Sequence, residues 1–309
     1  MPFKGATFIP AKFRLSYLHH DLLGHVPSPG FRGSGSANSL VTIDGDGLRF
    51  GGEGPISGDP AILAVGDSYT YGEEVSDTET WPAQLQRLIG RRVLNGGVSG
   101  YGLDQTVLRA EQLTALHRPS VVIVSFVADD IVRTEMRRLW WRNKPWFAIE
   151  AGQLVLKGVP VPNRTRLPLY IRHQIEQVLI KLPRFLQHLL GYHARVHPVG
   201  LGPAIVKGLT ERLARLQSED RVRIVVMAQY HPSVWLNKAF ANEQIRLTRA
   251  VLGCAMASGL ATLDTFQRLA CEPTKHRYYA SSHMNARGNL MIARLLAATL
   301  PVLPSARSG

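Results

Sequence analysis

The sequence has few of the residues that build disulfide frameworks or thiolate metal sites. Only two cysteines, Cys254 and Cys271, occur among its 309 residues. Two cysteines cannot form a disulfide framework, and their separation does not match metal-ligand spacing. Acidic residues are also scarce, with 23 Asp and Glu against 36 Lys and Arg, which leaves a formal net charge of +13. This balance predicts an anionic partner such as a nucleic acid, an acidic polysaccharide or a lipid surface.

Long hydrophobic runs are absent as well. No run reaches the roughly 18 uncharged apolar residues that a membrane-spanning helix needs. Residues 1–23 place Lys4, Lys12 and Arg14 among apolar residues, so they lack the apolar centre of a signal peptide. We therefore expect a cytoplasmic chain, and an anchor trimmed from a longer precursor stays open as an alternative. The 45% hydrophobic and 19% charged residues are typical of a globular protein and exclude disordered or collagen-like classes.

Short apolar runs alternate with helical patterns from residue 61 onward, after a Gly-, Ser- and Pro-rich segment. Residues 1–60 are interpreted as an N-terminal arm laid over the domain, and residues 301–309 as a C-terminal tail. The expected strands cover 61–65, 93–95, 121–127, 222–227 and 260–263, and the expected helices cover 81–89, 105–116, 242–258 and 285–300. This alternation predicts a three-layer α/β/α sandwich with a central parallel sheet over residues 61–300.

Residues 133–208 interrupt the alternation and are interpreted as an insertion over the carboxyl edge of the sheet, where α/β folds bind ligands. Its aromatic and basic residues around Trp140 and Trp146 could stack on sugars of an anionic chain, or pack the insertion onto the domain, which is commoner. A basic amphipathic stretch, residues 170–195, could lie on a membrane surface. Burial against the domain is the commoner use of such a stretch. No nucleic-acid-binding module is present, so a nucleic acid is not an expected partner.

Two residues outside the insertion could carry chemistry. Ser68 directly follows the first expected strand, so its hydroxyl would face the cleft, with helix N–H groups aimed at a developing oxyanion. The alternative is that Ser68 only caps the following helix. A lone histidine before a helix, such as His283, is usually a surface or capping residue, but with a cleft serine it becomes the candidate general base. The glycine-rich turn 95–102 lacks the GxGxxG spacing and the P-loop lysine, so a nucleotide site is not predicted.

Four segments in chain order resemble the conserved blocks of the SGNH (GDSL-type) hydrolases and acyltransferases. They are GDSYTYGEEV, NGGVSGYGLDQ, VSFVADDI and SSHMNARGN. The resemblance spans residues 30–300, and NKPWFAIEAGQLVLKGVPVP is similar to the insertion of a bacterial subgroup. It implies the flavodoxin-like fold of that family, Ser68 as nucleophile and His283 as base. It also implies that the backbone N–H groups of Ser68 and Gly100 form the oxyanion hole, and that neither a metal nor an organic cofactor takes part.

Two positions depart from the family pattern. Asp129 stands where the third block usually carries an Asn whose amide donates to the oxyanion, so a role for Asp129 there requires a neutral carboxylic acid. The last block usually carries an Asp two or three residues before the histidine, and here Ser281 and Ala280 occupy those positions. Asp264, after the last strand, is one candidate to replace that acid. A backbone carbonyl or Ser281 holding the ring is the other.

These observations predict a serine-dependent acyl-ester hydrolase, an esterase or deacetylase acting on an acylated carbohydrate or a small ester. An O-acyltransferase of glycan biosynthesis and a catalytically impaired binding protein are the alternatives. The substrate site is predicted to be lined by Tyr69, Asp130, Trp140 and Trp146. The positive charge would suit an anionic or lipid-linked glycan.

Overall fold

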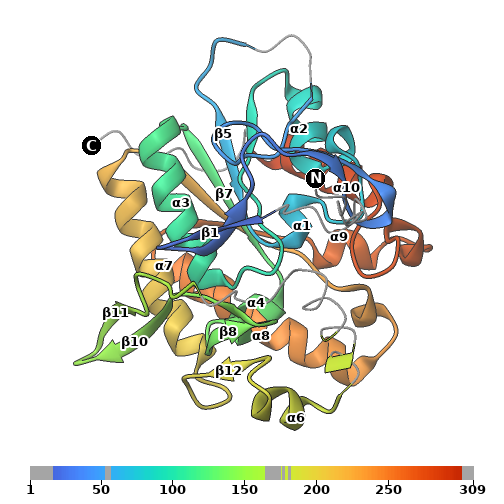
Figure 1. Ribbon diagram of the computed structural model, residues 1–309. Helices are drawn as coiled ribbons and strands as arrows, with labels where there is room; N and C mark the ends of the chain where they lie inside the picture. The colour runs from blue at the N-terminus through green and yellow to red at the C-terminus, as the bar shows by residue number, and fades with distance from the viewer. Residues whose placement is uncertain (1–16, 53–56, 164–174, 176–177, 180–181, 301–309) are drawn as a thin grey trace, which may run out of the picture.

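A parallel β-sheet forms the centre of the molecule (Figure 1). The computed structural model describes residues 17–52, 57–163, 175, 178–179 and 182–300. The sheet has five strands in the order β14-β13-β7-β5-β6, and every neighbouring pair is parallel. Its strands are β5 (Ile62–Val65), β6 (Val93–Asn95), β7 (Val121–Phe126), β13 (Arg223–Ala228) and β14 (Ala261–Asp264). The bounds of each strand lie within one residue of those expected from its apolar run.

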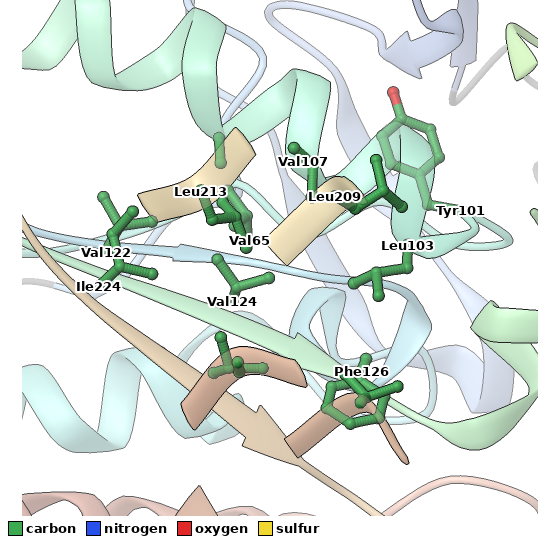
Figure 2. Close-up of a cluster of buried hydrophobic side chains, with 14 of the residues drawn as sticks. Val65, Tyr101, Leu103, Val107, Val122, Val124, Phe126, Leu209, Leu213 and Ile224 are labelled. Carbon is green, nitrogen blue, oxygen red and sulfur yellow. The ribbon is translucent and has the colours of Figure 1, made fainter. Parts of the chain in front are cut away.

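Helices cover both faces of this sheet. Alternate strand residues point to opposite faces, so Val65 and Val124 join one core with α3, α7 and α8, as Figure 2 shows in part. Ile62 and Ile123 join the other core with α2 and α10. The bounds are α2 (Trp81–Ile89), α3 (Leu103–His117), α7 (Gly202–Glu219), α8 (Lys238–Ala257), α9 (Phe266–Ala270) and α10 (Ala286–Thr299). The predicted three-layer α/β/α fold is therefore confirmed.

Side-chain caps fix where two of these helices begin. Thr80 accepts a hydrogen bond from the backbone N–H of Ala83 at 3.3 Å and starts α2, with Pro82 in the first turn. Asn285 accepts from the N–H of Gly288 at 3.0 Å and starts α10. The α10 cap positions the loop that precedes this helix, and that loop carries His283.

The strand order reverses between β5 and β7. The chain runs from β5 outward to β6, then returns across β5 to form β7 on its other side. Open α/β sheets bind ligands where the strand order reverses in this way. Two short helices start at this edge, α1 (Ser68–Tyr71) after β5 and α4 (Ala128–Arg133) after β7. The segments that resemble the first and third family blocks therefore meet at one edge.

Residues 17–52 form two hairpins, and a buried arginine joins them to the domain. The hairpins are β1 (Tyr17–His20) with β2 (Gly24–Pro27), and β3 (Arg32–Ser34) with β4 (Leu40–Thr42). Arg49 follows them, with a fully buried side chain that pairs with Asp77 at 3.0 Å. Its guanidinium also donates to four backbone carbonyls, those of Leu40, Tyr71, Gly72 and Val75. Arg49 thereby ties the hairpins to the loop that follows α1.

The expected insertion forms a small sheet and a hairpin. The small sheet consists of β8 (Met136–Leu139), β9 (Arg142–Asn143) and β12 (Ala194–Arg195), and the hairpin of β10 (Trp146–Glu150) and β11 (Gln153–Lys157). Lys144 attaches this region to α3 through a buried ion pair with Asp104. The expected end of the insertion at residue 208 falls inside α7, which packs in the main core. After the insertion, the chain therefore rejoins the core at the start of α7, earlier than the sequence pattern indicated.

Much of the amphipathic stretch 170–195 lies outside the described residues. Its described part contains α6 (Arg184–Leu189), where Phe185 and Leu189 are exposed, whereas Leu179 is buried. The exposed residues are compatible with membrane contact and the buried one with packing on the domain, so both interpretations of this stretch stay predictions. Among the described residues, no helix has both the length and the apolar character to cross a bilayer.

We predict that Arg49→Met lowers the free energy of unfolding by about 3–5 kcal/mol, because it leaves Asp77 as a buried unpaired charge and several carbonyls unsatisfied. Urea denaturation measures the change. Arg32→Met, which removes an exposed arginine of the same hairpins, is the control and should change the free energy by less than about 0.5 kcal/mol. Equal effects of the two substitutions would contradict the anchoring role of Arg49.

Candidate active site

Ser68 lies at the start of α1, in the short turn that follows strand β5. The N-cap of α1 is Asp67, whose carboxylate accepts from the backbone N–H of Tyr69 at 2.9 Å. Capping is therefore done by Asp67, and the alternative interpretation of Ser68 as a helix cap is wrong. The close turn requires Gly66, because a Cβ there would lie 2.7 Å from the carbonyl oxygen of Ser125. The Ser68 hydroxyl is left for other contacts.

The structure brings His283 to this hydroxyl across most of the length of the chain. Nε2 of His283 lies 2.8 Å from Oγ of Ser68, within hydrogen-bonding distance. An imidazole in this position can accept the serine proton, as an activated nucleophile requires. The pair expected from the sequence is thus in contact, with the His283 side chain 20% exposed.

Tyr69 supports the loop that carries His283. Its hydroxyl donates to the carbonyl of Ser282 at 2.7 Å, and its ring centroid lies 5.1 Å from that of His283. Burial raises the pKa of Tyr69 well above its usual value, so the phenol stays a neutral donor. Tyr69 was predicted to line the substrate site; its described contacts lie against the histidine loop, and the substrate contact stays a prediction.

A carboxylate lies next to His283, and it belongs to Glu74. Oε1 of Glu74 is 3.5 Å from Nδ1 of His283, and the Glu74 side chain is 11% exposed. The backbone N–H groups of Ser281 and His283 donate to Glu74 at 2.9 and 3.4 Å, and the Ser281 hydroxyl donates to it as well. Burial acts to raise the pKa of Glu74, but the Ser281 hydrogen bonds and the charge of His283 together lower it to about 2.

Asp264 is not the partner of His283. Its carboxylate accepts from the Tyr230 hydroxyl at 2.9 Å and from the backbone N–H of Phe266 at 2.9 Å. These contacts hold the end of β14 and the start of α9, so the prediction that Asp264 replaces the missing acid is corrected in favour of Glu74. Glu74 was missed because it lies far from His283 in the sequence. The acidic pair after the nucleophile in GDSYTYGEEV was the available signal.

Gly100 lies in the turn after β6, beside the nucleophile loop. Val98 in this turn donates to the carbonyl of Gly66 at 3.0 Å, which fixes the turn against β5. Gly100 has φ of +82°, and a Cβ there would lie 2.6 Å from the ring of Trp140. Only glycine fits both constraints. Trp140, whose ring also lies over Arg133 at 5.5 Å, is therefore next to the predicted oxyanion hole.

Trp146 lies elsewhere in the insertion. Its ring packs on His197 with the centroids 5.4 Å apart, and it contacts Gly158 beyond the hairpin. The described contacts of Trp146 join segments of the insertion to each other rather than to Ser68. Of the two tryptophans predicted to bind substrate, only Trp140 contacts a residue of the predicted oxyanion hole.

Asp129 is the exposed carboxylate in the first turn of α4. Its Oδ1 accepts a hydrogen bond from the side-chain amide of Gln244 in α8 at 3.2 Å. This contact occupies one carboxyl oxygen of Asp129, and the donation to an oxyanion expected of this side chain stays a prediction.

Asp130 forms part of a buried network rather than a substrate surface. It is fully buried, and one oxygen lies 2.5 Å from Nη1 of Arg133 while the other accepts from the N–H of Val127. Asp67 lies 3.6 Å from the same Arg133 nitrogen. Burial raises the pKa of both carboxyl groups, and the proximity of Asp67 raises that of Asp130 further. Asp130 was predicted to contact substrate, but it is fully buried and instead binds Arg133, which also lies near Asp67.

The part of the chain that the structure describes contains no group of three or more His, Cys, Asp or Glu side chains placed to hold a metal ion. The side chains brought together are instead a serine, a histidine, carboxylates and an arginine. Ser68 and His283 provide a nucleophile and a base, and Glu74 provides a charge behind the base. This arrangement is suited to acyl transfer through a serine.

The family model that matches this chain agrees with this chemistry. Residues 64–290 match the model of the GDSL-like lipase/acylhydrolase family. No curated protein matches the chain in sequence. Solved structures with a similar fold include a lipase/acylhydrolase from Enterococcus faecalis, with 14% identity, a TM-score of 0.45, and coverage of 81% of this chain and 100% of that one.

Two further structures are similar to the same extent. An alpha/beta hydrolase enzyme from the metagenome of Lake Arreo, Spain, is 14% identical with a TM-score of 0.48, over 81% of this chain and 98% of that one. An acetyl xylan esterase from Geobacillus stearothermophilus is 15% identical with a TM-score of 0.47, over 79% of this chain and 95% of that one.

The lowered pKa of Glu74 predicts a pH-dependent contribution to stability. Because the pKa in the folded state, about 2, lies below the unfolded value near 4.5, the contribution is fully present above that unfolded value. It is lost as the pH falls toward the folded pKa. We expect the difference in unfolding free energy between wild type and Glu74→Gln to narrow between about pH 5 and about pH 3. Urea denaturation at each pH measures it, and a pH-independent difference would contradict the ionised Glu74.

Proposed function

Since residues 64–290 match its model, the chain belongs to the GDSL-like lipase/acylhydrolase family, and we propose that it hydrolyses an acyl ester through a covalent intermediate on Ser68. The observation that carries the proposal is the 2.8 Å contact between Oγ of Ser68 and Nε2 of His283. A serine at the start of a helix, in contact with a histidine that accepts its proton, is the arrangement that acyl transfer requires.

The proposed reaction has two halves. His283 takes the hydroxyl proton as Oγ of Ser68 attacks the ester carbonyl, and a tetrahedral oxyanion forms. The protonated His283 then gives that proton to the departing alcohol, which leaves an acyl group on Ser68. In the second half His283 takes a proton from water, the hydroxide attacks the acyl-serine, and the carboxylic acid leaves as Ser68 regains its proton.

The oxyanion is proposed to be held by backbone N–H groups. Those of Ser68, at the start of α1, and Gly100, in the turn after β6, are the candidates. Helix N-termini carry partial positive charge that favours a developing anion. In this proposal Asp129 serves as an acceptor for Gln244 and is not one of these donors. We therefore assign the oxyanion hole to the backbone alone, with fewer donors than the family pattern supplies.

The substrate is proposed to be a small acyl ester, acetyl in particular, carried on a carbohydrate. Trp140 supports this choice because it brings an aromatic ring next to Gly100, and aromatic faces pack well against sugar rings. The net charge of +13 favours an anionic glycan. Water is the proposed acceptor of the acyl group, and an acceptor hydroxyl of a second sugar would make the same chemistry a transfer.

Labelling with a fluorophosphonate tests the nucleophile. We expect one label per wild-type molecule by intact mass, with none on Ser68→Ala and at least tenfold slower labelling of His283→Ala, since the base activates the serine. The exposed Ser57 provides the control, because Ser57→Ala should be labelled at the wild-type rate. A folded wild-type protein that takes no label would contradict the proposal and favour a binding function.

Substitution of Asp129 tests the oxyanion hole. Asp129→Asn replaces an acceptor carboxylate with the amide donor of the family pattern, and one such donor is worth about 10²–10³ in kcat. We therefore expect kcat for an acetyl ester to rise at least about tenfold, with KM changed little. Asp129→Ala, which removes the carboxylate without adding a donor, is the control and should gain less. A collapse of activity in Asp129→Asn would show that the carboxylate has its own role.

A further inference from the structure

We propose that Glu74 is the positioning residue of His283, replacing the acid that the family pattern places shortly before the histidine. The inference rests on the proposed function, because it concerns the same Ser68–His283 pair. Glu74 lies in the loop between α1 and α2, within the block that contains the nucleophile. The acid and the nucleophile are thus carried by one segment, and the histidine loop docks onto both.

The direction of the hydrogen bonds supports this role. For Nε2 of His283 to accept the Ser68 proton, Nδ1 must carry a proton of its own and donate it. Nδ1 lies 3.1 Å from the Ser282 hydroxyl and 3.5 Å from Glu74, and that hydroxyl lies 3.4 Å from the same Glu74 oxygen. An ionised carboxylate can only accept hydrogen bonds. Glu74 is therefore the final acceptor for the Ser282 hydroxyl and for Nδ1 of His283, and both donors are oriented toward it.

Glu74 also sets the position of the imidazole ring. Its carboxylate accepts from the backbone of both Ser281 and His283, so it clasps the loop from which the ring projects. Arg49 holds the other side, because its guanidinium donates to the backbone carbonyls of Gly72 and Val75 around Glu74 at 2.6 Å each. A preorganised carboxylate stabilises the imidazolium that forms when Ser68 loses its proton.

The adjacent Glu73 provides a matched control. Its carboxylate accepts from the hydroxyl of Ser36 at 2.7 Å and from that of Ser99, and so contacts a different set of loops. Other ionisable groups act on His283 as well. Asp67 and His231 interact with its charge, and the neutral phenol of Tyr69 lies against its ring. These groups are unchanged in variants of Glu73 and Glu74, so differences between such variants report on the two glutamates.

The first test is the activity of Glu74→Gln against Glu73→Gln. Because the amide can present a donor to Nδ1, it favours the wrong tautomer, and we expect kcat to fall about 10²–10⁴-fold. The acidic limb of the pH–rate profile should also move to lower pH, since the carboxylate charge that favours imidazolium is gone. Glu73→Gln should keep kcat within about threefold and leave that limb in place.

The second test moves the acid to the family position. The Ser281 hydroxyl already points at the Glu74 carboxylate, so Ser281→Asp places a charge close to where Glu74 holds its own. Alone, Ser281→Asp should lower activity through repulsion between the two carboxylates. Added to Glu74→Gln, it should raise kcat at least about tenfold over the single variant. A merely structural role for Glu74 predicts no such reversal of sign.

The outcomes separate this proposal from the proposed function. Hydrolysis that is lost in Ser68→Ala but kept within threefold in Glu74→Gln would overturn the role of Glu74 alone. If the wild type shows no hydrolysis, the proposed function fails, and an NMR titration of His283 in Ser68→Ala decides on Glu74. There the midpoint should fall when Glu74→Gln is added, and an unchanged midpoint would overturn the proposal. If Glu74→Gln does not fold, Glu74→Asp should retain about a tenth of kcat, and a loss as deep as that of Ser68→Ala would overturn it.

Discussion

The buried guanidinium of Arg49 is the contact on which the arrangement of the site depends. It reaches from the N-terminal hairpins into the loop after α1 and satisfies carbonyls at both ends of the turn that carries Glu74. A loop of this kind exposes backbone groups that would otherwise bond to water. By supplying the donors from one rigid side chain, Arg49 gives the loop a single conformation, and Asp77 balances its charge. The hairpins are thus part of the catalytic scaffold.

Two groups of carboxyl side chains near Ser68 differ in how their charge is stabilised. Beneath it, Asp67 and Asp130 share one guanidinium, Arg133, away from solvent. Burial raises the pKa of both carboxyl groups, because removal from water penalises their charged forms, and the proximity of Asp67 raises the pKa of Asp130 further. Above it, Glu74 is held in the ionised form by several donors from the histidine loop. The negative charge of the site is therefore concentrated behind His283, where an imidazolium needs it.

Local signals in the sequence were sufficient for the sheet, whereas the resemblance to a known family singled out Ser68 and His283. Strands β5, β7 and β13 are continuous apolar runs that only a sheet covered on both faces can bury. Thr80 and Asn285 mark their helices through caps that depend on adjacent residues alone. Helix α7 was missed because its Gly202 and Pro203 start follows the irregular insertion, and its apolar face is diluted by charged residues. Its place in the core follows from packing rather than from local pattern.

The residues that sequence reasoning missed are those whose roles arise from contacts between segments distant in the chain. Nothing local distinguishes buried Arg49 from exposed Arg32, or Glu74 from Glu73, because burial and partners are set by the tertiary fold.

The family arrangement places the acid on the histidine loop, so ring and acid move together. Here the acid is on the nucleophile loop, so any displacement of the histidine loop breaks the Ser68 contact and the Glu74 contact at the same time. The nucleophile loop and the histidine loop are then held together in part by the attraction between Glu74 and His283. An intact site requires the two loops to be in contact.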